Sequence, residues 1–288
     1  MIKIENIRVA GFIPAIQSIR NSYASWDKGD SEYVVEVSND AGITCYDGII
    51  FGDNDLKLAK NLIKAGEPHC KFRRMIAVWM DITAPLYWWK QFDTYKIGTV
   101  ANSESTMHNI ADNQFTNDMF SISDSVKRSE AFQNILVELN NLRRLYKREP
   151  KENKQYFNDI IALLPESYNQ RRSVMLNYSV LANMYEQRKN HKLGEWAEFC
   201  DIIVGVPHGW MITGDVENGA IANYRSNKRE IKEMDWENKM YTACDMLRDG
   251  APVSRIAMTL GLSESTVLNY VTKFEEEKMN GRENTSEE

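Results

Sequence analysis

The stretch YWWKQFDTYKIGTVANSESTMH, residues 87–108, decides how the fold is interpreted. It contains two tryptophans, two lysines, one aspartate and several hydroxyl side chains within one short span. It follows FRRMIAVWMDITA, a bulky alternating segment that predicts a β-strand closed by Pro85. The span itself is either a further strand of the core or the wall of a pocket.

The polar residues of this span favour the pocket wall. Buried strands are usually continuous in valine, isoleucine and leucine, and burying Lys90, Asp93 and Lys96 without partners would be costly. Trp88 and Trp89 are adjacent, so on a strand one would face the core and the other would be free to stack on a ring. Aromatic faces, lysines, hydroxyls and amides together suit a planar, anionic ligand.

Strand and helix patterns are mixed along the chain, which indicates an α+β fold. Alternation predicts a first strand over residues 2–12, and turn residues between β-rich runs predict a hairpin or an ordered loop over residues 26–52. Apolar residues at helical spacing predict helices over residues 14–22, 53–65, 123–146, 152–164, 170–187 and 195–204.

Composition excludes several classes of protein. The 288 residues are 43% apolar and 26% charged, as in ordinary globular proteins with more than one folding unit. A formal net charge of -6 argues against a surface that tracks nucleic acid over its whole extent. No apolar run is long enough to span a membrane, and the N-terminus lacks a signal-peptide pattern.

The cysteines indicate the compartment. Cys45, Cys70, Cys200 and Cys244 are widely scattered, without a CxxC pair. We therefore expect no disulfide framework and no metal site, and the pattern fits a reducing cytoplasm.

The segment PVSRIAMTLGLSESTVLNYVTKF, residues 252–274, has the pattern of a helix-turn-helix. Ala257 is the small residue where the two helices would touch, Gly261 is the turn, and Ser263 is the expected N-cap of the second helix. The residues expected on the inward faces are Ile256, Leu260, Leu262, Val267 and Tyr270.

The second helix of this module offers a set of polar side chains to a DNA groove, namely Ser265, Thr266, Asn269 and Lys273. Glu264 and residues 275–277, all glutamates, oppose a polyanion, so protein contacts are an equal alternative to DNA binding. The expected organisation is a main domain over residues 1–214, a linker over 215–235, the helical module over 236–278 and a disordered tail over 279–288.

Two motifs carry a resemblance to a known family: QFDTYKIGT, residues 91–99, and NSESTMH, residues 102–108. They are similar to the signature of the flavin-dependent thymidylate synthases (the ThyX family), Gln-x-x-Arg-His-Arg-x-x-Ser followed by Asn-Glu-x-Ser-x-Arg-Tyr. Gln91, Asn102 and Ser105 match directly, while Lys96 stands for an arginine and Thr99 for the serine.

Further matches in the same order extend the resemblance over residues 1–212. IRNSY, residues 19–23, resembles the family's Ala-Arg-x-Ser-Tyr, and PHCKF, residues 68–72, resembles Glu-His-x-x-Phe. LNYSVLANMYEQR, residues 176–188, is similar to the family's Asn-x-Arg…Leu-x-x-Phe-Leu-x-x-Arg helix, with matches at Asn177, Leu181 and Arg188.

The resemblance implies a mixed sheet with flanking helices, in a homotetramer whose sites lie between subunits. The residues that it implies for binding FAD are Tyr95, Lys96, Thr99, Asn102 and Asn177. Those that it implies for binding a pyrimidine nucleotide are Gln91, Ser105 and Arg188. The implied reaction is reductive methylation of a deoxyuridine monophosphate with methylenetetrahydrofolate. The flavin carries the hydride, and no side chain is assigned as catalytic.

The sequence also departs from the family pattern. Thr94 and Tyr95 stand where the family has arginine and histidine, and Met107 stands where it has a further arginine. Two other functions therefore stay open. One is a phage or mobile-element regulatory protein that kept the fold without catalysis and binds DNA. The other is a pyrimidine-modifying enzyme with a hydroxymethyl or another product.

Overall fold

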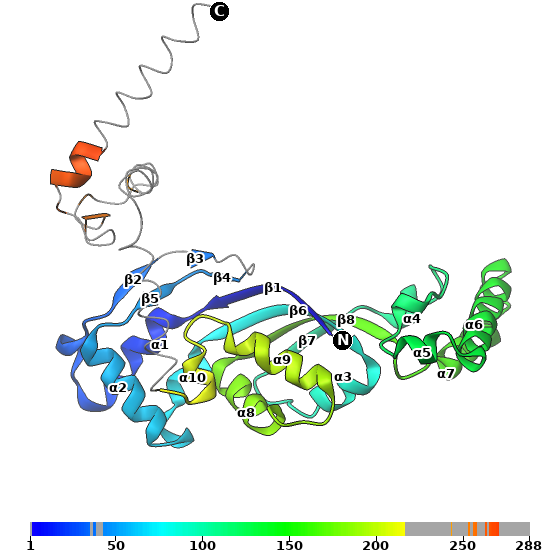
Figure 1. Cartoon of the computed structure of the whole chain (residues 1–288), viewed down its shortest axis with the longest axis horizontal. Coiled ribbons are helices and arrows are strands. Elements are labelled where there is room, and N and C mark those ends of the chain that lie inside the picture. The colour runs from blue at the N-terminus through cyan, green and yellow to red at the C-terminus, as the bar shows by residue number, and fades with distance from the viewer. Residues whose placement is uncertain are drawn as a thin grey trace, which may run out of the picture. The chain divides into compact units, whose positions relative to one another are not determined.

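A mixed sheet forms the centre of the computed structural model (Figure 1). Among the described residues its six strands have the order β3-β4-β1-β6-β8-β7. Their bounds are β1 Lys3–Ala10, β3 Val37–Ser38, β4 Thr44–Cys45, β6 Ala77–Pro85, β7 Val100–Ser103 and β8 Asn169–Asn177. β1 and β4 are parallel and the other pairs are antiparallel, which confirms the predicted α+β class with a mixed sheet.

The structure describes residues 2–34, 37–38 and 43–216, and in the C-terminal part residues 243, 253, 256, 257, 263 and 265–270. The chain divides into two units, Met1–Gly219 and Ala220–Glu288, and each is described by itself. No helix of the described residues is long and apolar enough to cross a bilayer.

The central strand β6 shows why the sheet has two different faces. Its side chains alternate, with Val78 and Met80 buried on one face and Trp79 on the other. In Figure 1 a group of helices lies together on one side of the sheet. These helices are α1 Phe12–Ser18, α2 Asp53–Lys64, α3 Leu86–Phe92, α8 Tyr178–Arg188, α9 Gly194–Val204 and α10 Trp210–Thr213.

A second group of helices has a small core of its own at one end of the sheet (Figure 1). It comprises α4 Thr106–Asn109, α5 Asp124–Lys127, α6 Glu130–Arg148 and α7 Lys154–Leu163. Phe132, Leu139 and Ile160 lie in that core, and the Ser129 side chain caps α6 by accepting from the Phe132 N–H at 3.3 Å. The helix predicted over residues 152–164 is confirmed with shifted ends, whereas the one predicted over residues 123–146 is divided into α5 and α6 by a break before the N-cap Ser129.

The tryptophan-rich span is a helix at its start, so the alternative of a further strand is wrong, and so is the expectation that one tryptophan would be free to stack on a ring. Pro85 ends β6, and the chain continues as α3 with Trp88, Trp89 and Phe92 all buried. Positions i, i+1 and i+4 fall on one face of a helix, whereas on a strand they would divide between two faces. Both tryptophans therefore belong to the core, and neither is free to stack on a ligand.

The predicted helix over residues 170–187 is also wrong in its first half. Residues Asn169–Asn177 form β8, which pairs with β6 over the whole length of the strand. The alternation of exposed Arg171 with buried Gln170, and of exposed Met175 with buried Val174, fits a strand with one covered face. The helix begins only at Tyr178, where the Asn177 side chain accepts a hydrogen bond from the Val180 N–H at 3.0 Å.

The predicted hairpin region over residues 26–52 contains four short strands among its described residues. β2 Glu32–Val34 pairs with β5 Gly48–Ile50, and β3 pairs with β4. Short 3-10 helices connect other elements, namely η1 Asn21–Tyr23, η2 Trp26–Lys28, η3 Glu67–His69, η4 Lys71–Met75 and η5 Asn117–Met119.

In the C-terminal unit the described residues include a small apolar cluster. Ala243, Ile256, Ala257 and Val267 are buried together. The Ser263 hydroxyl accepts a hydrogen bond from the Thr266 N–H at 3.1 Å, so the expected N-cap of the helix over residues 265–270 is confirmed. The helix-turn-helix as a whole stays a prediction, because its turn at Gly261 lies outside the described residues. The expected tail, residues 279–288, and residues 217–235 of the expected linker also lie outside the described residues.

Candidate functional site

A cavity of about 1040 Å³ lies between α8 and the loop that follows α3. The loop contributes residues 94–98, α8 contributes one face, and residues around η3, η4 and α10 form the remaining walls. Of the residues predicted to bind cofactor, Tyr95, Lys96 and Asn177 line it. The structure thus brings three of the five predicted cofactor residues to one cavity.

Gly98 explains how the loop can lie so close to α8. Its φ of 79° is in the left-handed region that favours glycine. A Cβ at this position would lie only 3.0 Å from both the Asn177 Nδ2 and the Val180 Cγ2. A larger residue would therefore push the loop away from the helix start and change the width of the cavity.

Cationic side chains from η4 and from the loop after α3 line the cavity. Arg73, Arg74 and Lys96 all line the cavity, together with the carboxylates of Glu67 and Glu186. Arg73 is only 4% exposed, and its Nη1 forms an ion pair with Glu67 Oε1 at 2.6 Å. Its buried Nε has no hydrogen-bond partner among the described residues. A buried N–H without a partner is rare and costly, so this atom is suited to an acceptor on a bound molecule.

Beside the cavity, three predicted residues form one cluster around a guanidinium group. Arg188 donates from Nε to the Tyr95 hydroxyl at 2.8 Å and from Nη1 to Gln91 Oε1 at 3.3 Å. Its guanidinium lies over the Trp196 ring, 4.7 Å from the centroid. Trp196 donates in turn from Nε1 to Gln91 Oε1 at 2.8 Å. We call these four residues the Arg188 cluster.

The charge of Arg188 is not neutralised within the cluster. Tyr95 and Gln91 are uncharged acceptors, and in the described part of the chain no carboxylate forms an ion pair with Arg188. Burial, the Arg188 charge and the Lys192 charge lower the pKa of the nearby His191. A guanidinium that is fixed by neutral partners, one of which lines the cavity, is suited to an anion.

Comparison with known proteins gives a result only at the level of structure. No family model matches the sequence, and no curated protein matches it. A crystal structure of the flavin-dependent thymidylate synthase ThyX from Helicobacter pylori, complexed with FAD and dUMP, superimposes with a TM-score of 0.54 at 15% identity. The match covers 74% of this chain and 98% of that one. The chain has the fold of the flavin-dependent thymidylate synthases.

Two more structures extend the comparison. A second Helicobacter pylori ThyX structure with FAD and dUMP matches with a TM-score of 0.55 at 14% identity, over 76% of this chain and 100% of that one. A UMP/dUMP methylase from Streptomyces cacaoi, bound with 5-Br dUMP, matches with a TM-score of 0.47 at 10% identity, over 78% and 96%.

The remaining predicted site residues of the unit Met1–Gly219 lie away from the main cavity. Asn102 pairs with Ser173 of β8 and lines a separate cavity of about 630 Å³ on the outer face of the sheet. Ser173 lies four residues before Asn177, or about 13 Å along an extended strand. Ser105 precedes α4, beyond the end of β7. Thr99 lines none of these cavities, and its buried Oγ1 has no hydrogen-bond partner among the described residues.

Sequence reasoning missed several residues that line the main cavity of the unit Met1–Gly219. Arg73 and Arg74 lie in η4, within a segment that was predicted as the start of a strand. Asn183 and Glu186 follow Val180 at intervals of three residues, so all three lie on one face of α8. The spacing could have predicted this lining face from the sequence, but only if the helix had been predicted to begin at Tyr178.

Proposed function

We propose that this chain is an enzyme like the flavin-dependent thymidylate synthases, which methylates a deoxyuridine monophosphate reductively with FAD and methylenetetrahydrofolate. The observation that carries the proposal is the Arg188 cluster, a guanidinium that has no carboxylate partner among the described residues and is held by Tyr95, which itself lines the main cavity. The fold adds support, because the Helicobacter pylori proteins that share it are complexed with FAD and dUMP.

In this proposal Arg188 binds the phosphate of the nucleotide. Its orientation is fixed before binding by the Tyr95 hydroxyl and by Gln91, so little conformational entropy is lost when the anion arrives. Lys96 and Arg74, which line the main cavity, supply further positive charge. Ser105, which resembles a family residue that contacts the substrate, belongs to the same proposal on the sequence match alone.

The residues around the main cavity fit a flavin dinucleotide. Arg74 and Lys96 would hold its pyrophosphate, and the buried Arg73 Nε, which has no hydrogen-bond partner among the described residues, would donate to an uncharged acceptor of the bound molecule. Asn177 and Asn183 offer side-chain amides, and Gly98 leaves open the space that a Cβ would fill. When bound, the flavin would supply the hydride, while this chain orients the substrate and excludes water.

A homo-oligomer, a tetramer by resemblance, would complete the site. Asn102 and Ser105 lie apart from the main cavity in one chain. The outer face of the sheet carries Trp79, Val100 and Met175 in exposed positions. A second copy packed on that face would cover these apolar side chains and could bring Asn102 to the cavity of its neighbour.

The test starts with the purified full chain. Uptake of FAD is measured from the visible flavin spectrum, dUMP binding by calorimetry, and the product by mass spectrometry, which separates thymidylate from a hydroxymethyl product. We expect a bound flavin and a methylated nucleotide. A protein that takes up no flavin and binds no pyrimidine nucleotide would overturn the proposal.

One observation favours a second function, DNA binding by the C-terminal unit. On the helix capped by Ser263, Ser265 and Asn269 are exposed while Val267 is buried. Thr266 is half-buried, and Lys273 lies outside the described residues. Gel-shift experiments with the full chain and DNA from its own promoter region test this function. Specific binding that weakens steeply with salt supports it, and equal affinity for all sequences contradicts it.

A further inference from the structure

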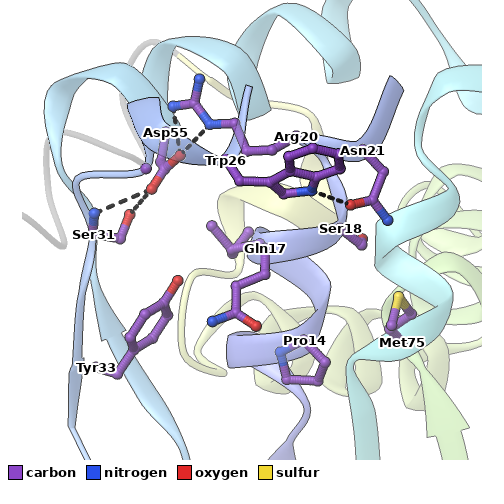
Figure 2. A pocket seen from close by; sticks show the side chains of 12 residues that line it. Pro14, Gln17, Ser18, Arg20, Asn21, Trp26, Ser31, Tyr33, Asp55 and Met75 are labelled. Atoms are coloured by element: carbon purple, nitrogen blue, oxygen red, sulfur yellow. Dashed lines mark hydrogen bonds and ion pairs between the residues drawn. The ribbon is translucent and has the colours of Figure 1, made fainter. Parts of the chain in front are cut away.

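A third cavity, of about 640 Å³, lies at α1 and has no role in the proposed reaction. Figure 2 shows its walls, which come from α1, from the turn over residues 20–31, from β2 and from the start of α2. The side chains that face it include Pro14, Gln17, Trp26, Tyr33 and Met75. We call it the Trp26 pocket.

A buried ion pair forms the back of the Trp26 pocket. Arg20 donates from Nε to Asp55 Oδ1 at 2.8 Å, and the two residues are only 7% and 2% exposed. Asp55 Oδ2 accepts from the Ser31 hydroxyl at 2.7 Å and from the Asp30 N–H at 3.2 Å. Burial opposes ionisation of Asp55, but the hydrogen bonds from Ser31 and Arg20 prevail and its pKa is lowered. The two charges compensate each other, so this wall attracts neither anions nor cations strongly.

Trp26 is exposed and yet held in one orientation. Its side chain is 62% exposed, and its Nε1 donates to Asn21 Oδ1 at 2.8 Å (Figure 2). The turn that carries it contains Ala24 at φ 44°, in the left-handed region that non-glycine residues rarely adopt. An exposed indole on a strained turn is unfavourable for the free protein, and such features concentrate at binding sites.

The remaining walls combine apolar surface with an amide. Pro14, Ile16 and Met75 contribute apolar contacts, and Gln17 extends into the space between Pro14 and Tyr33 (Figure 2). The Gln17 amide has both a donor and an acceptor, which matches the hydrogen-bonding edge of a heterocyclic ring. Burial and the Asp55 charge raise the pKa of the Tyr33 hydroxyl, and its hydrogen bond with the Gln17 side chain opposes this shift, so Tyr33 and Gln17 form one polar pair in this wall.

We propose that the Trp26 pocket binds an uncharged nucleobase, as a nucleoside or as a base of single-stranded nucleic acid, stacked on Trp26 and hydrogen-bonded at its edge to Gln17. A flat ring covers the exposed indole, and the Gln17 amide, which also has a side-chain hydrogen bond with Tyr33, keeps further donor and acceptor capacity for an amide-like edge. An isolated phosphate has no free cation here, because Asp55 already neutralises Arg20. The site is distinct from the Arg188 cluster and does not depend on the proposed reaction.

The test uses the full chain with ¹⁵N-labelled tryptophan side chains. The Nε1–H resonance that disappears in Trp26→Phe identifies Trp26, and thymidine and adenosine are then titrated separately. We expect this resonance to shift with either nucleoside and to saturate. Trp26→Ala should weaken nucleoside binding about tenfold or more, as removal of a stacking platform does. Gln17→Ala should weaken it by a smaller factor.

Two variants make the result specific. Trp79→Ala removes another exposed tryptophan and should leave nucleoside binding unchanged. Arg188→Gln should weaken dUMP binding strongly and leave the nucleoside response at Trp26 intact, which separates the two proposals. A short oligothymidylate that binds much more tightly than thymidine, and still depends on Trp26, identifies single-stranded nucleic acid as the source of the base.

The proposal is overturned if neither nucleoside nor the oligonucleotide moves the Trp26 resonance up to the limit of solubility. It is equally overturned if Trp26→Ala binds the nucleosides as well as the unmodified chain does. Because Trp26 is exposed, its replacement should leave the fold intact, and an unchanged amide spectrum elsewhere verifies this.

Discussion

Two arginines of this chain lie on tryptophan rings, and their surroundings differ in one respect. Arg172 lies over Trp89 at 4.3 Å, and Arg188 lies over Trp196 at 4.7 Å. Arg172 also donates from Nη1 to Asp93 Oδ1 at 2.8 Å, so its charge is neutralised. Arg188 contacts only uncharged acceptors within the described part of the chain.

The difference separates a structural contact from a binding contact. A guanidinium that already has a carboxylate partner gains little from a further anion, whereas one held by neutral groups keeps its charge for a ligand. The stacking geometry alone would not distinguish the two arginines. The partners of the guanidinium do, and they can be changed one at a time.

The largest expected effect concerns the rings beneath the two arginines. Trp89 and Trp196 are both fully buried, so Trp89→Ala and Trp196→Ala should each lower the free energy of unfolding by about 3–5 kcal/mol. Urea denaturation measures this. A loss below about 1 kcal/mol in either variant would mean that the two rings are not equivalent parts of the core.

The next effect separates the two arginines by ligand binding. Arg188→Gln should weaken dUMP binding by about 2–3 kcal/mol, because a charge-assisted contact to phosphate is lost. Its matched control, Arg172→Gln, should leave dUMP binding nearly unchanged. Calorimetry measures both affinities. Equal losses in the two variants would remove the distinction on which the proposed site rests.

A smaller effect is expected from the group that orients Arg188. Tyr95→Phe keeps the ring but removes the hydroxyl that accepts from Arg188 and donates to Gln187 at 2.9 Å. Affinity for dUMP should fall by about 1 kcal/mol, the net value of a typical hydrogen bond. Tyr168→Phe serves as control, since its hydroxyl belongs to the core of the helices at the other end of the sheet. Unchanged affinity in Tyr95→Phe would show that Arg188 needs no such support.

The smallest effect uses a third arginine, one with a carboxylate partner at the surface. Asp81 accepts from Ser173, from Asn6 at 2.8 Å and from Arg171 at 2.8 Å. These hydrogen bonds lower the pKa of Asp81 from 3.8 to about 2. Because the folded-state pKa is the lower one, the stabilisation is complete above the unfolded-state value and is lost as the pH falls from about 4 to about 2.

Asp81→Asn should therefore lower the free energy of unfolding by about 1 kcal/mol at neutral pH, and the difference from the unmodified chain should vanish near pH 2. Urea titrations at several pH values measure it. A difference that is independent of pH would assign the loss to packing and not to the charge of Asp81.

Sequence patterns located most helices and strands where the spacing of apolar residues and the capping or breaking residues at the ends indicate the same element. The helix over residues 53–65 has leucines at helical spacing and a glycine at its end, and the structure has α2 at Asp53–Lys64. The motif matches assigned Gln91 and Arg188 to one predicted substrate site, and in the structure the two side chains are hydrogen-bonded. The contacts form because α3 and α8 lie on the same face of the sheet. A motif shared with proteins of this fold implies that arrangement indirectly.

The errors have local physical causes. Trp88 and Trp89 seemed to belong to a strand because aromatic residues favour strands, but Pro85 ends β6 and the helical face of α3 satisfies all its large rings. The sequence of β8 fits both a helical and a strand spacing, because two arginines, at 171 and 172, precede its apolar residues. Pairing with β6 makes this segment a strand. Arg73 could not be found from sequence, since only the folded chain shows that its Nε lacks a partner.

Asn177 ends β8 and also caps α8, so a single residue joins two elements without any spacer. Lengthening the chain by one residue just after this point would rotate everything downstream by about 100° around the helix axis. Arg188 would then point away from Tyr95 and Gln91. Natural or engineered variants that keep the site should therefore tolerate insertions near the distal helices α6 and α7, and reject them at this junction.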